Sequence, residues 1–209
     1  MNEEKYKKAD RQQIVQAFRK AETYINGQKI IKTKEEEYLH FMRFYEIFAE
    51  NMPELKLTNK QIDSLARDLV FNEEKYIFYE EVEPVLAKLN ERYRLAIVSD
   101  AWPSLLNVYK KNKLEEYFEC FVISSMIGVA KPDKLMYLSA LEQLQIKPEE
   151  AVFVDDNVKN CRGAMKLGIH SILLCRENWW YLWNKVNSIG KGYKVTLNLK
   201  QLEKILKCM

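Results

Sequence analysis

Histidine, glycine and paired cysteines are scarce in this sequence, and each shortage narrows what the protein can be. Only His40 and His170 occur among 209 residues, so catalysis built on histidine is poorly supplied. The four cysteines form no CxxC pair, which argues against a disulfide framework and a zinc knuckle. The six glycines are about 3% of the chain, where about 7% is usual, so we expect them at positions that require glycine.

Long apolar runs and an excess of one charge are also missing. The longest apolar runs, near LAIV and SILL, are far below the roughly 18 residues that a membrane span needs. The first residues, MNEEKYKKADRQQ, are polar and contain no signal-peptide core. The 33 basic and 30 acidic residues leave a net charge of +3, which argues against a dedicated nucleic-acid binder. We therefore expect a cytoplasmic protein that binds neither nucleic acid nor a membrane.

Residues 1–75 have the hydrophobic spacing of helices. Aromatic and aliphatic residues recur three and four positions apart from Tyr38 to Ala49, after the acidic run KTKEEE. Thr58 precedes a second stretch with the same spacing and is a suitable N-cap. We expect this part of the chain to form a helical domain.

The remaining residues, 76–209, alternate short strand-like runs with amphipathic helical segments. The runs are LAIVS, CFVIS, AVFVD, HSILLC and YKVTL, which begin at residues 95, 120, 151, 170 and 193. Apolar strands separated by helices are typical of a parallel sheet with helices on both faces. The predicted fold class is α/β, with a Rossmann-like core at 76–209 and an N-terminal helical cap at 1–75.

Polar side chains follow the strand-like runs, and this is where ligands bind in parallel sheets. These side chains are Ser99 and Asp100, then Ser124, Ser125 and Lys131, and finally Asp155, Asp156 and Asn157. A hydroxyl group and a lysine suit a phosphate group, and adjacent carboxylates suit a hard cation such as Mg²⁺. The strand ends therefore predict a phosphate and metal site.

Each of these residues also has a simpler interpretation. Ser99 alone is typical of a strand end, and Lys131 alone is typical of a solvated loop. Asp156 could simply cap the next helix. The functional interpretation is favoured by their order, because the three groups occur at successive strand ends.

Two segments carry motifs that resemble those of a known family. They are EEVEPVLAKLNERYRLAIVSDAW and IGVAKPDKLMYLSALEQLQIKPEEAVFVDDNVKNCRGAMKLGIHSILL, and the resemblance extends from about residue 78 to about residue 206. The motifs are similar to those of the haloacid dehalogenase-like hydrolases, in particular the subgroup with a helical cap. Ser99 matches the family's phosphate-binding hydroxyl residue, and Lys131 matches the lysine of its third motif. Asp156 matches the metal-binding acid, with Asp155 beside it and Asn160 in a supporting position.

The resemblance implies a Mg²⁺-dependent phosphatase that acts on a small phosphorylated metabolite, with the cap closing over the site. It assigns catalysis to Ser99 and Lys131, substrate binding to Ser99, Asp100, Lys131 and Asn157, and the metal to Asp155 and Asp156, supported by Asn160. It also implies that Gly163 allows close helix packing and that Gly168 allows the turn into the next strand.

One part of the family's pattern is missing. The family's reaction begins with an aspartate nucleophile in a DxD motif at the end of the first, central strand, and this sequence contains no DxD. The resemblance therefore implies that the chain as written is inactive and that the strands LAIVS and AVFVD lose the neighbour between them. Truncation of a longer protein is the interpretation that we favour. Closure of the two strands, a foreign segment in the gap and genuine loss of the nucleophile are the alternatives.

Asp100 is a second departure, because an uncharged residue is common after the motif serine in this family. A carboxylate at this position would repel a phosphate dianion unless it faces away from the site or binds a cation.

A cluster of tryptophans leaves a different function open. The run NWWYLWN gathers Trp179, Trp180 and Trp183 on about two turns of a predicted helix. Packing against the sheet or the cap is one interpretation, and a partner surface, including a homo-oligomer contact through the tryptophans or the cap, is the other. A non-catalytic binding protein is accordingly the main alternative to a phosphatase, and a 2-haloacid dehalogenase is a further one.

Overall fold

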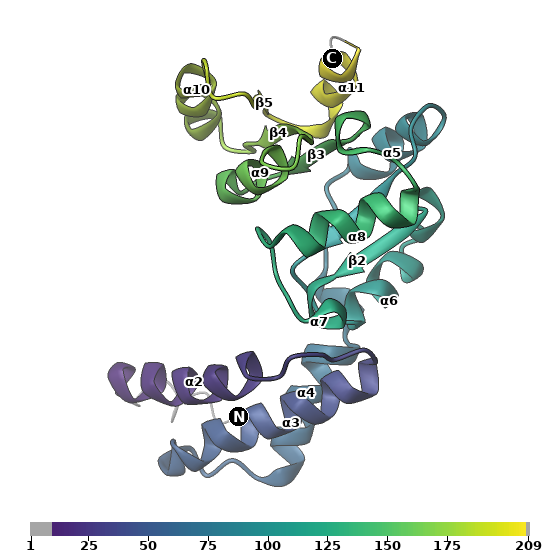
Figure 1. Cartoon of the computed structure of the whole chain (residues 1–209). Helices are drawn as coiled ribbons and strands as arrows, with labels where there is room; N and C mark the ends of the chain where they lie inside the picture. Colours follow the sequence, from purple (N-terminus) through teal and green to yellow (C-terminus); the bar gives the residue numbers. More distant parts are fainter. Residues whose placement is uncertain (1–9, 208–209) are drawn as a thin grey trace. The chain divides into compact units, whose positions relative to one another are not determined.

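The computed structural model of the chain describes residues 10–207, which form two compact units (Figure 1). Unit 1 contains residues 10–76 and 102–108, and unit 2 contains residues 77–101 and 109–207. The strand pattern of the sequence predicts that residues 102–108 belong to the α/β core, whereas the structure groups them with the helices of unit 1.

Unit 1 is built from helices whose N-caps are recognisable in the sequence. α2 spans Arg11–Asn26, α3 spans Lys34–Glu50 and α4 spans Asn59–Phe71, with 3₁₀ turns at Pro53–Leu55 (η1) and Glu73–Lys75 (η2). Thr58 caps α4 as predicted: its hydroxyl accepts a hydrogen bond from the Gln61 N–H, and the Gln61 side chain accepts one from the Thr58 N–H. Thr33 and Glu36 form the same capping box at α3.

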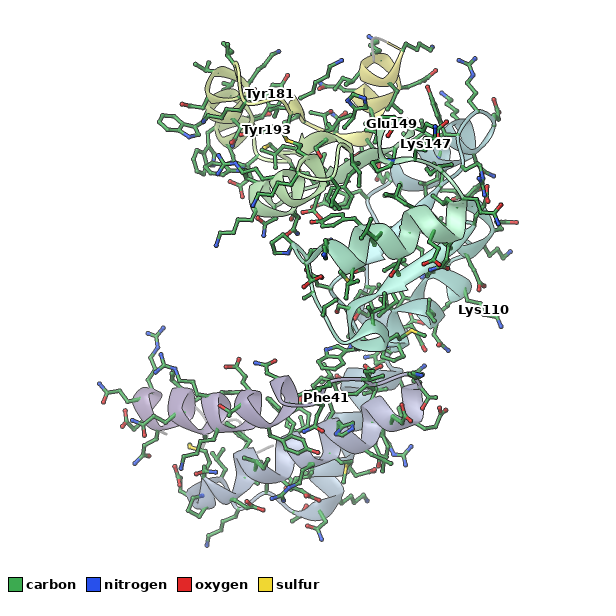
Figure 2. The ribbon with its side chains drawn as sticks, in the orientation of Figure 1. Phe41, Lys110, Lys147, Glu149, Tyr181 and Tyr193 are labelled. Atoms are coloured by element: carbon green, nitrogen blue, oxygen red, sulfur yellow. The ribbon has the colours of Figure 1, made fainter. Side chains whose placement is uncertain are left out.

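The core of unit 1 is rich in aromatic rings. Buried phenylalanines of α3, Phe41 among them (Figure 2), pack with buried alanines of α2. The Trp102 ring meets Phe41 edge to face, with 5.3 Å between the ring centroids. The buried Glu37 carboxylate accepts two hydrogen bonds of 2.8 Å, from the N–H and the hydroxyl of Ser104. These contacts explain why residues 102–108 belong to unit 1.

Unit 2, as described, contains five parallel strands in two sheets. The strands are β1 (Ala96–Ser99), β2 (Cys120–Ile123), β3 (Val152–Asp155), β4 (His170–Leu174) and β5 (Lys194–Thr196). β1 pairs with β2 in one sheet, and β4 lies between β3 and β5 in the other. Each strand begins and ends within one residue of the run that the sequence predicts, and the α/β fold class is confirmed.

Helices alternate with these strands. They are α5 (Val82–Asn90), α6 (Ser104–Lys111, which begins in unit 1), α7 (Ser124–Ile127), α8 (Lys134–Leu144), α9 (Val158–Met165), α10 (Asn178–Asn187) and α11 (Leu202–Leu206), with 3₁₀ turns at Glu115–Tyr117 (η3), Pro148–Glu150 (η4) and Leu199–Gln201 (η5). Among residues 10–207, no helix combines the length and the apolar character that a membrane crossing requires.

Helices cover both faces of the two sheets in unit 2. α8 lies along β2 (Figure 1) and also reaches the second sheet, where the Tyr137 ring meets Phe153 of β3 edge to face. The next residue of β3, Val154, faces the other way and clusters with Val85 of α5 and Leu202 of α11. β3 thus lies between a layer containing α8 and a layer containing α5 and α11.

The tryptophan helix α10 is attached to unit 2 on one side only. Tyr181 packs beside Tyr193 in the cluster that joins α9, β4 and β5 (Figure 2). Trp179 and Trp183 are 66% and 61% exposed, whereas Trp180 is 37% exposed. Packing against the sheet is therefore wrong for Trp179 and Trp183, because the side of α10 that faces the core is the side of Tyr181.

The buried Glu37 carboxyl predicts a pH-dependent contribution to stability. Burial raises the pKa of Glu37 above its ordinary value of 4.5, and the two hydrogen bonds from Ser104 offset this only in part. The folded protein therefore keeps this proton at a higher pH than the unfolded chain does. The resulting stabilisation is complete below about pH 4.5 and is lost as the pH rises through the folded pKa.

We expect the free energy of unfolding of the wild type, relative to Glu37→Gln, to fall as the pH rises over this interval. Urea denaturation of both proteins from about pH 4 to about pH 8 measures the difference. Glu35→Gln, which changes an exposed carboxylate of the same helical turn, is the matched control. A difference between the wild type and Glu37→Gln that stays constant with pH would contradict the raised pKa.

Candidate functional site

A cavity of about 820 Å³ runs along β1 and β3 and contains four of the predicted site residues. Ser99 ends β1, Lys131 lies in the loop before α8, and Asp155 and Asp156 lie at the end of β3. All four line the cavity within unit 2. The carboxyl ends of two parallel strands thus bring hydroxyl, ammonium and carboxylate groups together, as expected for this kind of sheet.

Lys131 and Asp155 form a buried ion pair. The Lys131 Nζ lies 2.7 Å from Asp155 Oδ2 and also donates to the carbonyl oxygen of Val98 at 2.9 Å. The two side chains are 10% and 6% exposed. Interpreting Lys131 as a solvated loop lysine is therefore wrong, because its ammonium group is withdrawn from water and held between the ends of β1 and β3.

Two asparagines orient the Asp155 carboxylate. Its Oδ1 accepts a hydrogen bond from the Asn157 N–H at 2.8 Å and another from the Asn160 side-chain amide at 3.1 Å. The Asn157 side chain in turn accepts from the Lys159 N–H and caps α9. The suggestion that Asp156 caps this helix is therefore wrong. Asn157 and Asn160 act on Asp155 and do not themselves line the cavity.

Asp100 contacts the backbone of the loop that carries Lys131, which we call the lysine loop. Its Oδ1 accepts a hydrogen bond of 2.8 Å from the Lys131 N–H, and the residue is exposed and does not line the cavity. The carboxylate therefore faces the backbone of the loop, which is one way to keep its charge away from a phosphate group. Its expected contact with substrate finds no support in this geometry.

The two glycines of the last motif occupy positions that require glycine. A Cβ atom on Gly163 would lie 2.7 Å from the Cβ of Pro132 and 2.9 Å from the hydroxyl oxygen of Tyr137. Gly168 has a φ of +90°, a conformation that other residues rarely adopt. The close approach at Gly163 brings α9 against the loop that carries Lys131.

Two buried groups near Asp155 are kept neutral by their surroundings. Burial, followed by the nearby Asp155 carboxylate, raises the pKa of the Cys161 thiol to about 12. The same two causes, in the same order, raise the pKa of Tyr137, whose hydroxyl donates to the Asn160 carbonyl at 2.9 Å. Both groups remain protonated near neutral pH, so neither supplies a nucleophile or a base here.

The described residues do not complete a metal site by themselves. Among residues 10–207, no group of three or more His, Cys, Asp or Glu side chains is arranged to hold a metal ion. Both oxygens of Asp155 already accept hydrogen bonds, and Asp156 is exposed beside it. Mg²⁺ requires octahedral coordination by oxygen atoms, so Asp156 offers one ligand of several.

Arg176 is the centre of a second charged cluster at the cavity. The sequence did not predict it. The Arg176 guanidinium group donates to Glu81 Oε1 at 2.7 Å and lies 3.7 Å from the ring centroid of Tyr79. Burial raises the pKa of Glu81, but hydrogen bonds from Arg176 and from the Leu199 N–H outweigh burial and lower it overall. Arg176 is the second residue after β4. Its position just beyond a strand end is the sequence signal that predicts it, as for Ser99 and Asp155.

The buried pair predicts a large loss of stability when one partner is removed. We expect Lys131→Met to lower the free energy of unfolding by about 3 kcal/mol, because the Asp155 carboxylate stays buried without its cation. Adding Asp155→Asn is expected to recover part of that loss. Lys134→Met removes an exposed lysine nearby and should change the free energy by less than about 0.5 kcal/mol. Equal losses for the two single lysine variants in urea denaturation would contradict a stabilising pair.

Comparison with known proteins identifies the family. A family model described as haloacid dehalogenase-like hydrolase matches residues 3–174. A glyceraldehyde 3-phosphate phosphatase from Pyrococcus furiosus is 26% identical over 153 residues, which cover 66% of this chain and 59% of the relative. A phosphoserine phosphatase from Thermus thermophilus is 29% identical over 137 residues, which cover 62% of this chain and 53% of the relative. The chain thus spans about half the length of these curated relatives.

Solved structures share the fold. A HAD phosphatase from Thermococcus onnurineus superimposes with a TM-score of 0.57 at 21% identity, covering 92% of this chain and 87% of that one. L-2-haloacid dehalogenase from Xanthobacter autotrophicus gives a TM-score of 0.59 at 20% identity, covering 96% of this chain and 94% of that one. With the family match over most of its length and this shared fold, the chain belongs to the haloacid dehalogenase-like hydrolases.

Proposed function

We propose that this chain forms the phosphate-binding part of a Mg²⁺-dependent phosphatase that acts on a small phosphorylated metabolite. The observation that carries the proposal is the buried pair of Lys131 and Asp155 beside Ser99, at the carboxyl ends of β1 and β3. Two relatives are named as phosphatases of phosphorylated metabolites, which supports the same class of substrate.

Each residue of the site has a role that its position supports. Ser99 would donate its hydroxyl hydrogen to a phosphate oxygen, and Lys131 would neutralise charge on the phosphoryl group. The Lys131 ammonium group is shielded from water. Its attraction to a phosphoryl group would therefore be stronger than the same attraction between two groups in water. Mg²⁺, when bound, would further stabilise the phosphoryl charge, with Asp156 as a ligand and Asp155 beside it.

The proposed reaction also needs an aspartate nucleophile, which we expect from a segment outside residues 10–207. Asp155 is paired with Lys131, and Asp156 is assigned to the metal, so neither is available. The nucleophile carboxylate would attack phosphorus, the bond between phosphorus and the alcohol oxygen would break, and the alcohol would leave with a proton from the second aspartate of the Asp-x-Asp motif. Water would then hydrolyse the acyl phosphate, releasing phosphate and regenerating the carboxylate. Residues 10–207 alone are therefore expected to be inactive.

A 2-haloacid dehalogenase is the second candidate, because solved dehalogenases share the fold. Lysine and serine at the strand ends would bind a carboxylate as well as a phosphate group. The adjacent Asp155 and Asp156 favour the phosphatase, because the second carboxylate is suited to a cation that accompanies phosphate. A non-catalytic protein would keep the fold and show neither reaction.

The test compares this chain with the same chain carrying an added N-terminal apolar strand that ends in Asp-x-Asp. Both are assayed with Mg²⁺ against p-nitrophenyl phosphate, glyceraldehyde 3-phosphate and phosphoserine. We expect phosphate release from the extended chain only, and a loss of about 100-fold in kcat when Lys131→Met is introduced into it. Lys134→Met in the extended chain is the matched control and should keep the rate.

Three outcomes would contradict the proposal. Turnover by the chain alone would show that no added nucleophile is needed. An extended, folded chain that hydrolyses none of the esters would argue against a phosphatase. Halide release from 2-chloropropionate by the extended chain, without phosphate release from the esters, would establish the dehalogenase instead.

A further inference from the structure

Helix α10 faces its apolar side away from the core of unit 2. Tyr181 packs in the cluster that joins α9, β4 and β5, and Asn184, almost one turn further along, is buried. The opposite side of α10, with the turn that follows it, carries Trp179, Leu182, Trp183, Val186 and Ile189, each at least 61% exposed. We call these five residues the tryptophan face. A helix that covers a sheet normally faces its apolar side inward, so α10 has the reverse arrangement.

The tryptophan face forms one stripe along the helix. Its other members on α10 follow Trp179 by three, four and seven positions, and residues at these intervals lie on one side of a helix. The Trp179 ring also meets the ring of Trp180 edge to face, with 5.3 Å between the centroids. Single exposed apolar residues are common on proteins, but a contiguous apolar stripe marks a surface that another molecule covers.

The chain around the tryptophan face is strongly basic. Residues 157–202 contain eight Lys and Arg residues but only one acidic residue, Glu177, whereas the whole chain has 33 basic and 30 acidic residues. The Glu177 carboxylate accepts a hydrogen bond of 2.7 Å from the Trp179 indole N–H. Lys185 and Lys191 are exposed, and each follows a member of the tryptophan face by two positions. This surface is therefore suited to a negatively charged partner.

α9 belongs to the same basic segment. It lies beside α10 (Figure 1) and contributes to the cluster that holds Tyr181. Lys159 and Arg162 of α9 and Lys166, its C-cap, are exposed. The positive charge around the tryptophan face therefore comes from two neighbouring helices.

The charge and shape of this surface favour a membrane over a protein partner. A second copy of the chain, in a symmetric dimer, would place the same basic surface opposite itself, and the lysines would repel each other. An acidic protein would need a groove that fits the projecting helix. A membrane of anionic lipids needs no such groove, since tryptophan is favoured at the level of the headgroups and lysine is attracted to the negative surface.

We propose that the tryptophan face binds peripherally to a membrane that contains anionic phospholipids. The axis of α10 would lie in the plane of the membrane, with the apolar side chains at the boundary between headgroups and acyl chains. Lys185 and Lys191 would extend from the edge of the face to the lipid phosphates. α10 has 10 residues, about 15 Å of helix, so it would lie on the membrane without crossing it.

Binding of this kind does not require a long apolar run. A spanning helix needs roughly 18 apolar residues in succession, whereas a helix on the membrane surface needs one apolar side with basic residues beside it. The expectation that the protein binds no membrane depends on the lack of long apolar runs, which does not argue against surface binding.

The tryptophan face is separate from the candidate site. Trp180 lines the cavity of about 820 Å³, whereas none of the five residues of the face does. Substitutions in the face therefore leave the groups that end β1 and β3 unchanged. Loss of membrane binding would not bear on the phosphatase, and lack of phosphate release would not bear on membrane binding.

The test measures cosedimentation of the whole chain with lipid vesicles. One set of vesicles contains phosphatidylcholine with about one third phosphatidylglycerol, and the other contains phosphatidylcholine alone. At low salt, we expect binding to the anionic vesicles to be at least about tenfold tighter. Because salt screens the lipid charge, raising the ionic strength to about 0.5 M should remove most of this difference.

Two leucines of nearly equal exposure separate the tryptophan face from exposed apolar surface in general. Leu182 is 62% exposed, and Leu39 of α3 is 64% exposed. We expect Leu182→Gln to weaken binding to anionic vesicles about fivefold and Leu39→Gln to leave it unchanged. Trp179→Gln combined with Trp183→Gln should weaken binding by more than about tenfold. Circular dichroism checks that each variant folds, as expected for exposed positions.

Two pairs of lysines test the contribution of charge. Lys185→Gln combined with Lys191→Gln should weaken binding to anionic vesicles about tenfold and leave binding to phosphatidylcholine alone unchanged. Lys110→Gln combined with Lys134→Gln removes the same charge from exposed positions on other helices and is the matched control. Equal losses for the two pairs would contradict the placement of lipid phosphates beside the tryptophan face.

Other results would overturn the proposal as a whole. One is no cosedimentation with anionic vesicles at low salt, and another is an equal loss of binding for Leu182→Gln and Leu39→Gln. Equal binding to both kinds of vesicle would contradict the requirement for anionic lipid. Self-association that Trp179→Gln with Trp183→Gln abolishes, measured by analytical ultracentrifugation and found without vesicle binding, would assign the tryptophan face to a second copy of the chain.

Discussion

The buried ion pair of Lys131 and Asp155 is the interaction on which the candidate site depends. The Lys131 ammonium group also contacts the Val98 carbonyl, so it connects the end of β1, the loop before α8 and the end of β3. Asn160 holds the other oxygen of Asp155, and Gly163 lets α9 approach the lysine loop closely. Removing one partner would leave a buried charge unpaired, so folding stability favours the same geometry that the proposed phosphate site requires.

The candidate site lies where the two sheets of unit 2 meet. Ser99 and Asp155 lie at the carboxyl ends of strands that do not pair with each other. The Lys131 ammonium group links these strand ends, because it contacts the Val98 carbonyl of β1 and the Asp155 carboxylate of β3.

Much of the fold was predictable because its signals are local. The five strands follow from apolar runs, and Thr58 was identified as an N-cap because a hydroxyl before a helical pattern can bond to the free N–H groups. The structure rejected two of the simpler interpretations that the sequence left open. Asn157, not Asp156, caps α9, and Lys131 is buried although its neighbours are those of a loop. The first case depends on a hydrogen bond two residues along the chain, and the second on contacts 24 and 33 residues away, which the hydrophobic pattern does not report.

The sequence by itself determined the α/β class, the positions of the strands and the residues that end them, because each depends on neighbours a few positions away in the chain. Only the tertiary structure showed that Asp100 faces the Lys131 backbone and that Arg176 pairs with Glu81. These features depend on which segments meet in space. Their energies come from burial and from charges brought together across 24 to 95 residues of chain, which no local pattern encodes.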